Sequence, residues 1–222
     1  MFKRVVAYGC SITAGTELGD HIVLGKTIVE VDTLKRSLGL QRWQQLELKY
    51  DLQAEGRRRS WVAHLARELQ CDYLNLAQSG SAIDQCLLRM KNQLHNTDDL
   101  IIVGLTYIQR ALKFSEEQEH TAKHQDLETA CWNWFRTIES MCEMNVSFVD
   151  VVDCKAGLTF RYCKNRDLKA YCESVWMRAK TRLIEIERPP WGPLHANSHP
   201  YESWHIEVAK RMKEYLNEQT TT

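Results

Sequence analysis

A serine near the amino terminus and a histidine near the carboxyl terminus could together perform nucleophilic catalysis. Ser11 lies in the stretch GCSIT of residues 9–13, directly after a short apolar run. A hydrolytic serine needs a base within hydrogen-bond reach and donors aimed at the developing oxyanion. His199 is the best candidate base, because a proline-flanked loop holds it just before the last expected helix. Gly80 could offer a backbone N–H and Thr106 a hydroxyl as the donors.

Each of these residues also has an ordinary structural interpretation. The stretch around Ser11 is not the G-x-S-x-G nucleophile elbow, because Thr13 stands at its fifth position. Ser11 could simply cap a helix after the strand, since serine is a common capping residue. His199 could be an ordinary loop histidine, and His205 is expected to be structural because it falls inside the last helix. Catalysis is therefore favoured by the surrounding motifs taken together, and not by Ser11 alone.

The elements that must position these residues follow an alternating pattern. Four short runs, at 4–8, 72–76, 100–103 and 146–152, are apolar throughout and are expected to be buried strands. Helices are expected at 61–69, 82–94, 116–142, 167–186 and 202–216. Strands that alternate with helices and are apolar on both faces are typical of an α/β fold with a parallel sheet covered on both sides. In such folds the site lies at the carboxyl ends of the strands, where Ser11, Gly80 and Thr106 fall.

Composition and charge exclude several other classes of protein. The chain has 222 residues, of which 44% are hydrophobic and 26% charged, as in soluble globular domains. Its 29 basic residues balance its 29 acidic ones, which argues against a strongly basic nucleic-acid binder. No apolar run approaches the length of a membrane helix, and the amino terminus lacks a signal-peptide pattern. The eight cysteines include no C-x-x-C pair, so we expect reduced thiols and a cytoplasmic location.

Four blocks of the sequence resemble those of the SGNH, or GDSL-like, hydrolase superfamily. The first resembles its Gly-Asp-Ser block with a Thr two residues on, and the last its Asp-x-x-His-Pro block. In order along the chain, they are GCSIT at 9–13, NLAQSG at 75–80, GLTY at 104–107 and ANSHP at 196–200. They appear in the family order over nearly the whole chain. The Gly-Cys-Ser start is similar to divergent members from phages and bacteria.

The resemblance implies a three-layer α/β/α sandwich of flavodoxin-like type and hydrolysis of an ester by Ser11 and His199. The N–H groups of Ser11 and Gly80 and the side chain of Thr106 would form the oxyanion hole. The implied substrate is a small-molecule or carbohydrate ester, with an O-acetyl group on a carbohydrate as one candidate. No metal or organic cofactor is implied, and neither a membrane nor a nucleic acid is an expected partner. The sequence does not set the oligomeric state.

Three positions depart from the family pattern. Cys10 replaces the family's Asp before the serine, and Thr106 replaces its oxyanion Asn. Ala196 replaces the Asp that would orient His199, and loss of such a group costs on the order of 10⁴ in rate. Asn197, His195, a main-chain carbonyl or a more distant carboxylate could take its place. The alternative is a binding module that keeps the fold and has lost activity.

Several other residues have two interpretations each. Arg110 could bind an acidic substrate group or form a surface ion pair. Glu17 and Asp20 could line the rim of the pocket, or they could only cap a helix and lie in solvent. Arg57–Arg59 are expected to be a solvated helix entry, although a nucleic-acid-associated protein could use them. His120 and His124, four positions apart on an expected helix, could bind a metal, but a solvated helix face is the favoured interpretation. A single domain spans 1–222, with a charged insertion at about 17–59 and a frayed tail at about 218–222.

Overall fold

The computed structural model describes residues 2–108, 110–114, 119–123, 126–151, 160–187, 189–190, 194 and 199–220. Its centre is a parallel sheet with the strand order β2-β1-β3-β6, formed by β1 (Arg4–Tyr8), β2 (Asp72–Asn75), β3 (Asp99–Gly104) and β6 (Ser147–Val149). Val6 of β1 lies opposite Leu74 of β2 and Ile101 of β3. A parallel bridge from Phe148 to Leu183 extends the sheet beyond β6. Each of the four strands overlaps one of the four apolar runs of the sequence.

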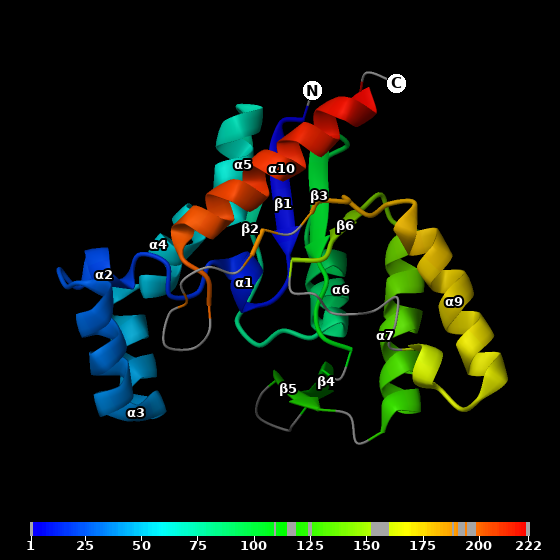
Figure 1. The fold of residues 1–222 in the computed structure, drawn as a ribbon, viewed down its shortest axis with the longest axis horizontal. Coiled ribbons are helices and arrows are strands. Elements are labelled where there is room, and N and C mark those ends of the chain that lie inside the picture. The colour runs from blue at the N-terminus through cyan, green and yellow to red at the C-terminus, as the bar shows by residue number, and fades with distance from the viewer. Residues whose placement is uncertain are drawn as a thin grey trace.

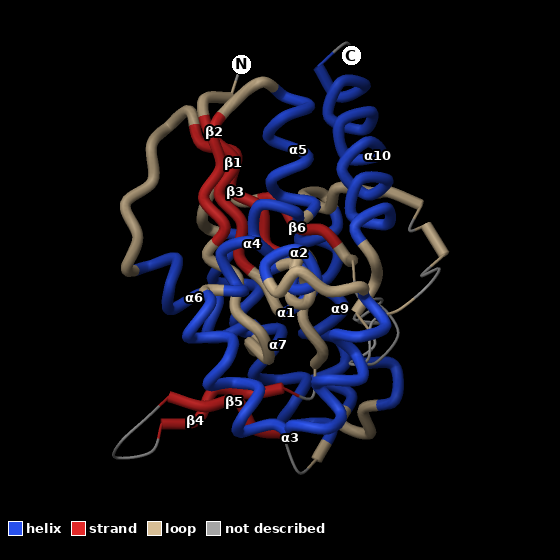
Figure 2. Tube along the Cα trace, turned by 90° about the vertical axis from the view of Figure 1, so that its left-hand side faces the viewer, coloured by secondary structure: helices blue, strands red, loops and turns tan. Residues whose placement is uncertain are grey.

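Helices cover both faces of this sheet. They are α1 (Ser11–Ala14), α2 (Asp20–Val23), α3 (Ile28–Tyr50), α4 (Leu52–Arg59), α5 (Trp61–Leu69), α6 (Ile83–Lys91), α7 (Leu127–Cys142), α9 (Arg166–Lys180) and α10 (Glu202–Thr220), with a short 3₁₀ turn at Phe160–Tyr162. Helices α5 and α10 pack together on one side of the strands, and α6 lies on the other (Figures 1 and 2). Helix α7 packs on α6, and α9 packs on α7. The expected three-layer α/β/α architecture is confirmed.

Two expected helices extend too far. The helix expected at 167–186 ends at Lys180 as α9, and Leu183 forms a bridge to Phe148. The stretch 116–142 was expected to be helical throughout, but Glu119–Lys123 forms strand β5, which pairs antiparallel with β4 (Arg110–Phe114). The helix begins only at Leu127, where the Asp126 side chain accepts a hydrogen bond of 2.7 Å from Thr129 N. The apolar i, i+3, i+4 spacing also begins at Leu127, so helical periodicity supports only the second part of the stretch.

The charged stretch after Ser11 folds largely into the helices α2, α3 and α4. Helix α3 starts with a capping box between Thr27 and Glu30 and is kinked at Gly39. Val31, Trp43 and Leu52 form a small hydrophobic core between α3 and α4, separate from the main core around the sheet. These helices lie beside the carboxyl end of β1 (Figure 1). They can therefore contribute side chains to a site there.

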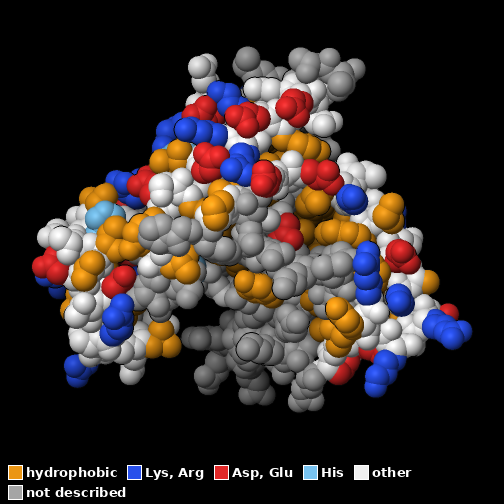
Figure 3. Space-filling view, in the orientation of Figure 1, with side chains coloured by type: hydrophobic (Ala, Val, Ile, Leu, Met, Phe, Trp, Pro, Cys, Tyr) orange, Lys and Arg blue, Asp and Glu red, His pale blue; other side chains and the backbone are white. Residues whose placement is uncertain are grey.

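The carboxyl-terminal helix carries charges of both signs. Acidic and basic side chains lie side by side over α10 on the face seen in Figure 3, as the pairs Lys213–Glu68 at 2.8 Å and Arg211–Glu207 at 2.9 Å illustrate. The helix continues to Thr220, so the tail expected to fray from Glu218 is helical up to that residue. Over the described ranges, no helix combines the length and apolar character that a membrane span would require.

Candidate active site

The loop that carries Ser11 is held close to the loop that follows β2. Ser11 is the first residue of α1, directly after the Gly9–Cys10 turn. Gln78 N donates to Gly9 O at 3.2 Å, which ties the two loops together. The Asn75 side chain donates to Thr13 O at 2.8 Å and to Ser60 Oγ at 3.0 Å, and so fixes α1 against the start of α5. Both loops therefore meet at the carboxyl edge of the sheet, where a site was expected.

Thr13 explains why glycine stands at two of these strand ends. A Cβ atom on Gly9 or on Gly104 would lie 2.4 Å from Thr13 Oγ1, which is far closer than atoms can approach. The Thr13 side chain is fully buried between the ends of β1 and β3. The threonine two residues after the serine thus has a packing role that fixes the geometry of the turn carrying Ser11.

The two expected oxyanion donors have different environments. Gly80 has φ +77°, a left-handed conformation that favours glycine, and open space lies where a Cβ would stand. Thr106 is fully buried, and its Oγ1 has no hydrogen-bond partner among the described residues. Its carbonyl oxygen accepts a bond of 3.0 Å from Trp134 Nε1, which anchors the loop after β3. The Thr106 hydroxyl is therefore enclosed by protein, and its expected role as an oxyanion donor stays a prediction.

His199 is held by a carboxylate that the sequence did not single out for this role. His199 Nδ1 lies 2.7 Å from Glu17 Oε2, and only 1% of the Glu17 side chain is exposed. Because an ionised carboxylate can only accept, the ring donates its Nδ1 proton to Glu17, which in a neutral imidazole makes Nε2 the proton acceptor. Glu17 adopts φ +73°, a left-handed conformation that is strained for a non-glycine residue. The fold thus holds Glu17 in a costly backbone conformation beside His199.

A buried lysine supports Glu17 from the other side. Lys35 Nζ of α3 lies 2.5 Å from Glu17 Oε1 and 2.9 Å from Asp20 Oδ2. The same ammonium group lies 4.6 Å from the centre of the Trp43 ring. Helix α3, part of the charged stretch after Ser11, therefore reaches the histidine through a chain of charged contacts, Lys35–Glu17–His199.

These contacts decide the charge of the buried carboxylates. Burial by itself raises the pKa of the Glu17 carboxyl, but the hydrogen bond from His199 and the charge and hydrogen bond of Lys35 outweigh it and lower that pKa to about 2. Burial raises the pKa of Asp20, and Lys35 opposes this only in part. Burial lowers the pKa of Lys35, but the two carboxylates outweigh it and hold that pKa above its usual value. Glu17 is therefore ionised at neutral pH.

The structure leaves some of the expected site residues outside its described ranges. His195, Ala196 and Asn197 lie there, so their roles beside His199 stay predictions. Arg110 begins β4, and its side chain is likewise outside the description. His205 is structural, as expected, because its buried ring accepts a bond of 3.1 Å from Trp61 N.

Glu17 and Asp20 are buried and bonded, and neither is a solvated cap or a residue of an open rim. Glu17 is 3% exposed and Asp20 is also 3% exposed, and both contact Lys35. Two acidic residues within nine positions of Ser11 were the only sequence signal. A strained backbone at Glu17 and a partner 182 positions away leave no local pattern in a sequence.

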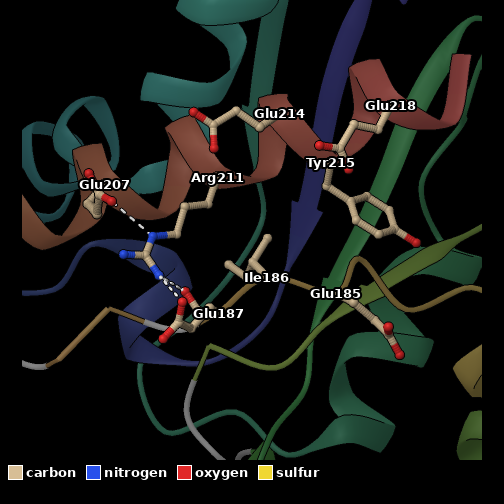
Figure 4. Close-up of a pocket in the computed structure, with 8 residues that line it drawn as sticks. All are labelled: Glu185, Ile186, Glu187, Glu207, Arg211, Glu214, Tyr215 and Glu218. Atoms are coloured by element: carbon tan, nitrogen blue, oxygen red, sulfur yellow. Dashed lines mark hydrogen bonds and ion pairs between the residues drawn. The ribbon is translucent and has the colours of Figure 1, made fainter. Parts of the chain in front are cut away.

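A cavity of about 400 Å³ lies between α10 and residues 185–187 (Figure 4). Its walls carry five glutamates around one arginine and one tyrosine: Glu185, Glu187, Glu207, Glu214, Glu218, Arg211 and Tyr215. Tyr215 Oη donates to Leu183 O at 3.0 Å, and Arg211 pairs with Glu207. The carboxyl half of α10 lies at the end of the sheet opposite α1, where the two termini meet (Figure 1). This cavity is therefore separate from the Ser11 and His199 loops.

Comparisons with known proteins point to one kind of fold. No protein-family model matches the chain, and no curated protein matches its sequence. Among solved structures, an acetyl xylan esterase (Est2A) from Butyrivibrio proteoclasticus aligns with a TM-score of 0.57 at 11% identity, over 100% of this chain and 65% of that one. A carbohydrate esterase family 2 enzyme with a carbohydrate-binding domain, from Corynascus thermopiles (Myceliophthora fergusii), aligns with a TM-score of 0.53 at 12% identity, over 97% and 67%.

A third similar structure is the psychrotrophic esterase EstA from Pseudoalteromonas sp., inhibited by monoethylphosphonate. It aligns with a TM-score of 0.51 at 11% identity, over 99% of this chain and 100% of that one. At such low identity these likenesses show the fold alone. The chain shares its three-layer fold with these esterases, as the resemblance of its sequence blocks implied.

Proposed function

We propose that the protein is a serine esterase in which Ser11, His199 and Glu17 act as a catalytic triad. The observation that carries the proposal is the hydrogen bond of 2.7 Å between His199 Nδ1 and Glu17 Oε2. A carboxylate at Nδ1 fixes the imidazole tautomer and stabilises the imidazolium that forms during acyl transfer. Glu17 lies only six positions after Ser11, and Thr16 N donates to Ser11 O at 3.0 Å, so the turn between them is compact. The histidine is therefore tethered to the turn that carries the nucleophile.

The reaction follows from these roles. His199 Nε2 takes the proton of Ser11 Oγ as that oxygen attacks the acyl carbon. The N–H groups of Ser11 and Gly80 stabilise the oxyanion of the tetrahedral intermediate, with the Thr106 hydroxyl as a further donor. When the intermediate collapses, His199 gives its proton to the departing alcohol and Ser11 keeps the acyl group. A water molecule, deprotonated by His199, then releases the acid and restores Ser11.

The substrate class is an ester with a small acyl group. Two of the similar structures are carbohydrate-active esterases by name, and we extend this to an O-acetyl group on a carbohydrate as the substrate to test first. The alternative of an inactive binding module depended on Ala196, which leaves His199 without an acidic partner at the usual position. Glu17 supplies such a partner and weakens that alternative. The proposal needs no acidic residue at position 196.

The decisive experiment is labelling with a fluorophosphonate probe, followed by mass-spectrometric mapping of the modified residue. We expect the label on Ser11, with no labelling of Ser11→Ala or His199→Ala. Hydrolysis of p-nitrophenyl acetate should be lost to a similar extent in both variants, because nucleophile and base act as a unit. Thermal unfolding of Ser11→Ala should stay near that of the wild type. A wild-type protein that neither labels nor hydrolyses a broad panel of acyl esters would rule the proposal out.

A further inference from the structure

A cavity of about 430 Å³ lies along β2, the edge strand of the sheet, and is rich in arginine. Arg57 and Arg58 of α4 and Arg89 of α6 line it, together with residues 73–76 of β2 and its exit. The described residues that line this cavity include no aspartate or glutamate. Arg57 and Arg58 belong to the basic run that was expected to lie in solvent at a helix entry. In the structure they line this cavity.

Two of the three arginines keep hydrogen-bonding capacity for a ligand. Arg57 is only partly exposed, and its buried Nε has no hydrogen-bond partner in the described part of the chain. Because Nε itself is enclosed, a ligand in the cavity would be bound by the terminal nitrogens of the Arg57 guanidinium. Arg89 donates to the uncharged oxygens Ser81 Oγ at 3.0 Å and Gln78 Oε1 at 2.6 Å, so its charge is not neutralised by these bonds. Arg58 differs, because it pairs with Glu55 at 3.1 Å.

The remaining basic residue of the run is already used by the fold. Arg59 bridges Glu55 at 2.8 Å and Glu202 at 2.7 Å, and so joins α4 to the start of α10. Glu55 and Glu202 are thus committed to structural pairs. Among the described residues that line the cavity, the positive charge left without an acidic partner is that of Arg57 and Arg89. Two guanidinium groups suit a dianion, and their planar N–H forks match phosphate geometry.

The volume and the other walls limit the size of the ligand. A cavity of about 430 Å³ is in the range of small-molecule sites and holds more than a bare phosphate ion. Tyr73, Leu74 and Leu76 give it an apolar wall against which an organic group could pack. Gln78, whose amide oxygen accepts from Arg89, offers a polar contact at the rim. These features together describe a phosphate-binding end and an adjoining apolar wall.

We infer that this cavity is a binding site for a phosphomonoester, whose phosphate lies between Arg57 and Arg89 and whose organic part packs on Tyr73 and Leu76. A phosphomonoester carries a charge near −2 at neutral pH, which balances the two arginines. The site borders the loop that leads to Gly80, because Gln78 of that loop lines the cavity. The same residue is hydrogen-bonded through its N–H to Gly9 O. The inference stands apart from the proposed hydrolysis and does not require Ser11 to be a nucleophile.

The test is calorimetric titration of the full chain at low ionic strength with inorganic phosphate, glucose 6-phosphate and glucose. We expect both phosphate-bearing probes to bind, glucose 6-phosphate to bind more tightly, and glucose to give no signal. Arg57→Gln and Arg89→Gln should each weaken binding by about tenfold or more, since each removes charge-assisted hydrogen bonds. Arg42→Gln, at an exposed arginine of α3, is the matched control and should bind as the wild type does.

A second measurement makes the result independent of how well the variants fold. Amide chemical shifts of the wild-type protein should move on addition of glucose 6-phosphate at Leu76 and Gln78, and not on α10. Wild-type protein that binds neither phosphate probe would overturn the inference. So would equal weakening by Arg42→Gln, or shift changes confined to another region. The inference would also be overturned, in favour of a nucleic-acid surface, by binding of a single-stranded oligonucleotide without a terminal phosphate, if Arg57→Gln, Arg89→Gln and Arg42→Gln all weaken that binding.

Discussion

Glu17 Oε2 and His199 Nδ1 lie 2.7 Å apart although 182 positions separate the two residues. The carboxylate comes from the turn after the nucleophile candidate, whereas the family pattern would place it three residues before the histidine, at Ala196. The two arrangements are chemically equivalent, because the role requires only an ionised acceptor at Nδ1. The burial of Glu17 makes its contribution stronger, since little water competes for the same oxygen.

Replacing Glu17 with glutamine should reduce ester hydrolysis by about 10³–10⁴-fold in kcat, because an amide can hold the wrong tautomer of His199. The value of KM for p-nitrophenyl acetate should change little. Glu173→Gln, an exposed glutamate of α9, serves as the control and should keep wild-type rates. Steady-state kinetics on the three proteins measure the effect. Full activity in Glu17→Gln would remove Glu17 from the triad.

Removing the charge of Lys35 should destabilise the fold and the site together. Lys35→Met leaves Glu17 and Asp20 buried without the cation that separates them, and breaking a buried ion pair in this way costs about 3–5 kcal/mol. Urea unfolding measures the loss. Arg36→Met, at the exposed neighbour on α3, is the matched control and should cost far less. Unchanged stability of Lys35→Met would mean that Lys35 does not hold the two carboxylates.

The acid sensitivity of the fold should depend on Glu17. Its pKa is about 2 in the folded chain against an ordinary value of 4.5, so the ionised form favours folding. This stabilisation, on the order of 3 kcal/mol, is fully present above about pH 4.5 and is lost as pH falls toward 2. The raised pKa of Asp20 acts in the opposite sense and offsets part of it.

The free energy of unfolding of the wild type and of Glu17→Gln should therefore be compared at several pH values. We expect the difference between them to be largest near neutrality and to shrink between about pH 4.5 and pH 2. The difference between the wild type and Glu173→Gln provides the baseline. A gap for Glu17→Gln that stays constant across this range would show that Glu17 ionisation is not linked to folding.

The sequence predicted the framework of the site better than its charged centre. The strand at 4–8 and the helix at 61–69 match β1 and α5 residue for residue, because burial and capping leave periodic local patterns. The placement of Ser11 after β1 follows from the same pattern. By contrast, the Glu17–His199 contact depends on the left-handed backbone at Glu17 and on how α3 packs, and neither has a local signature.

The same distinction explains the helix boundaries and the basic run. Glu119–Lys123 is a strand because it pairs antiparallel with β4, and pairing between two segments is invisible to helical periodicity. Arg57 was expected in solvent because a run of three arginines has no apolar pattern. It lines a cavity together with residues of the edge strand β2, which begins 15 residues later, at Asp72.

Thr106→Val tests whether the buried hydroxyl after β3 stabilises the oxyanion. The side chain is fully buried with no partner for Oγ1 in the described ranges, so a change to valine should leave stability unchanged or raise it slightly. If the hydroxyl turns toward the oxyanion during the reaction, kcat should fall about 10²-fold, with little change in KM. Thr106→Ser keeps the hydroxyl and should retain most of the rate. If Thr106→Val and the wild type have equal rates, the oxyanion donors are the N–H groups of Ser11 and Gly80 without the hydroxyl. If Thr106→Val instead loses stability, the hydroxyl makes a structural hydrogen bond in the folded protein.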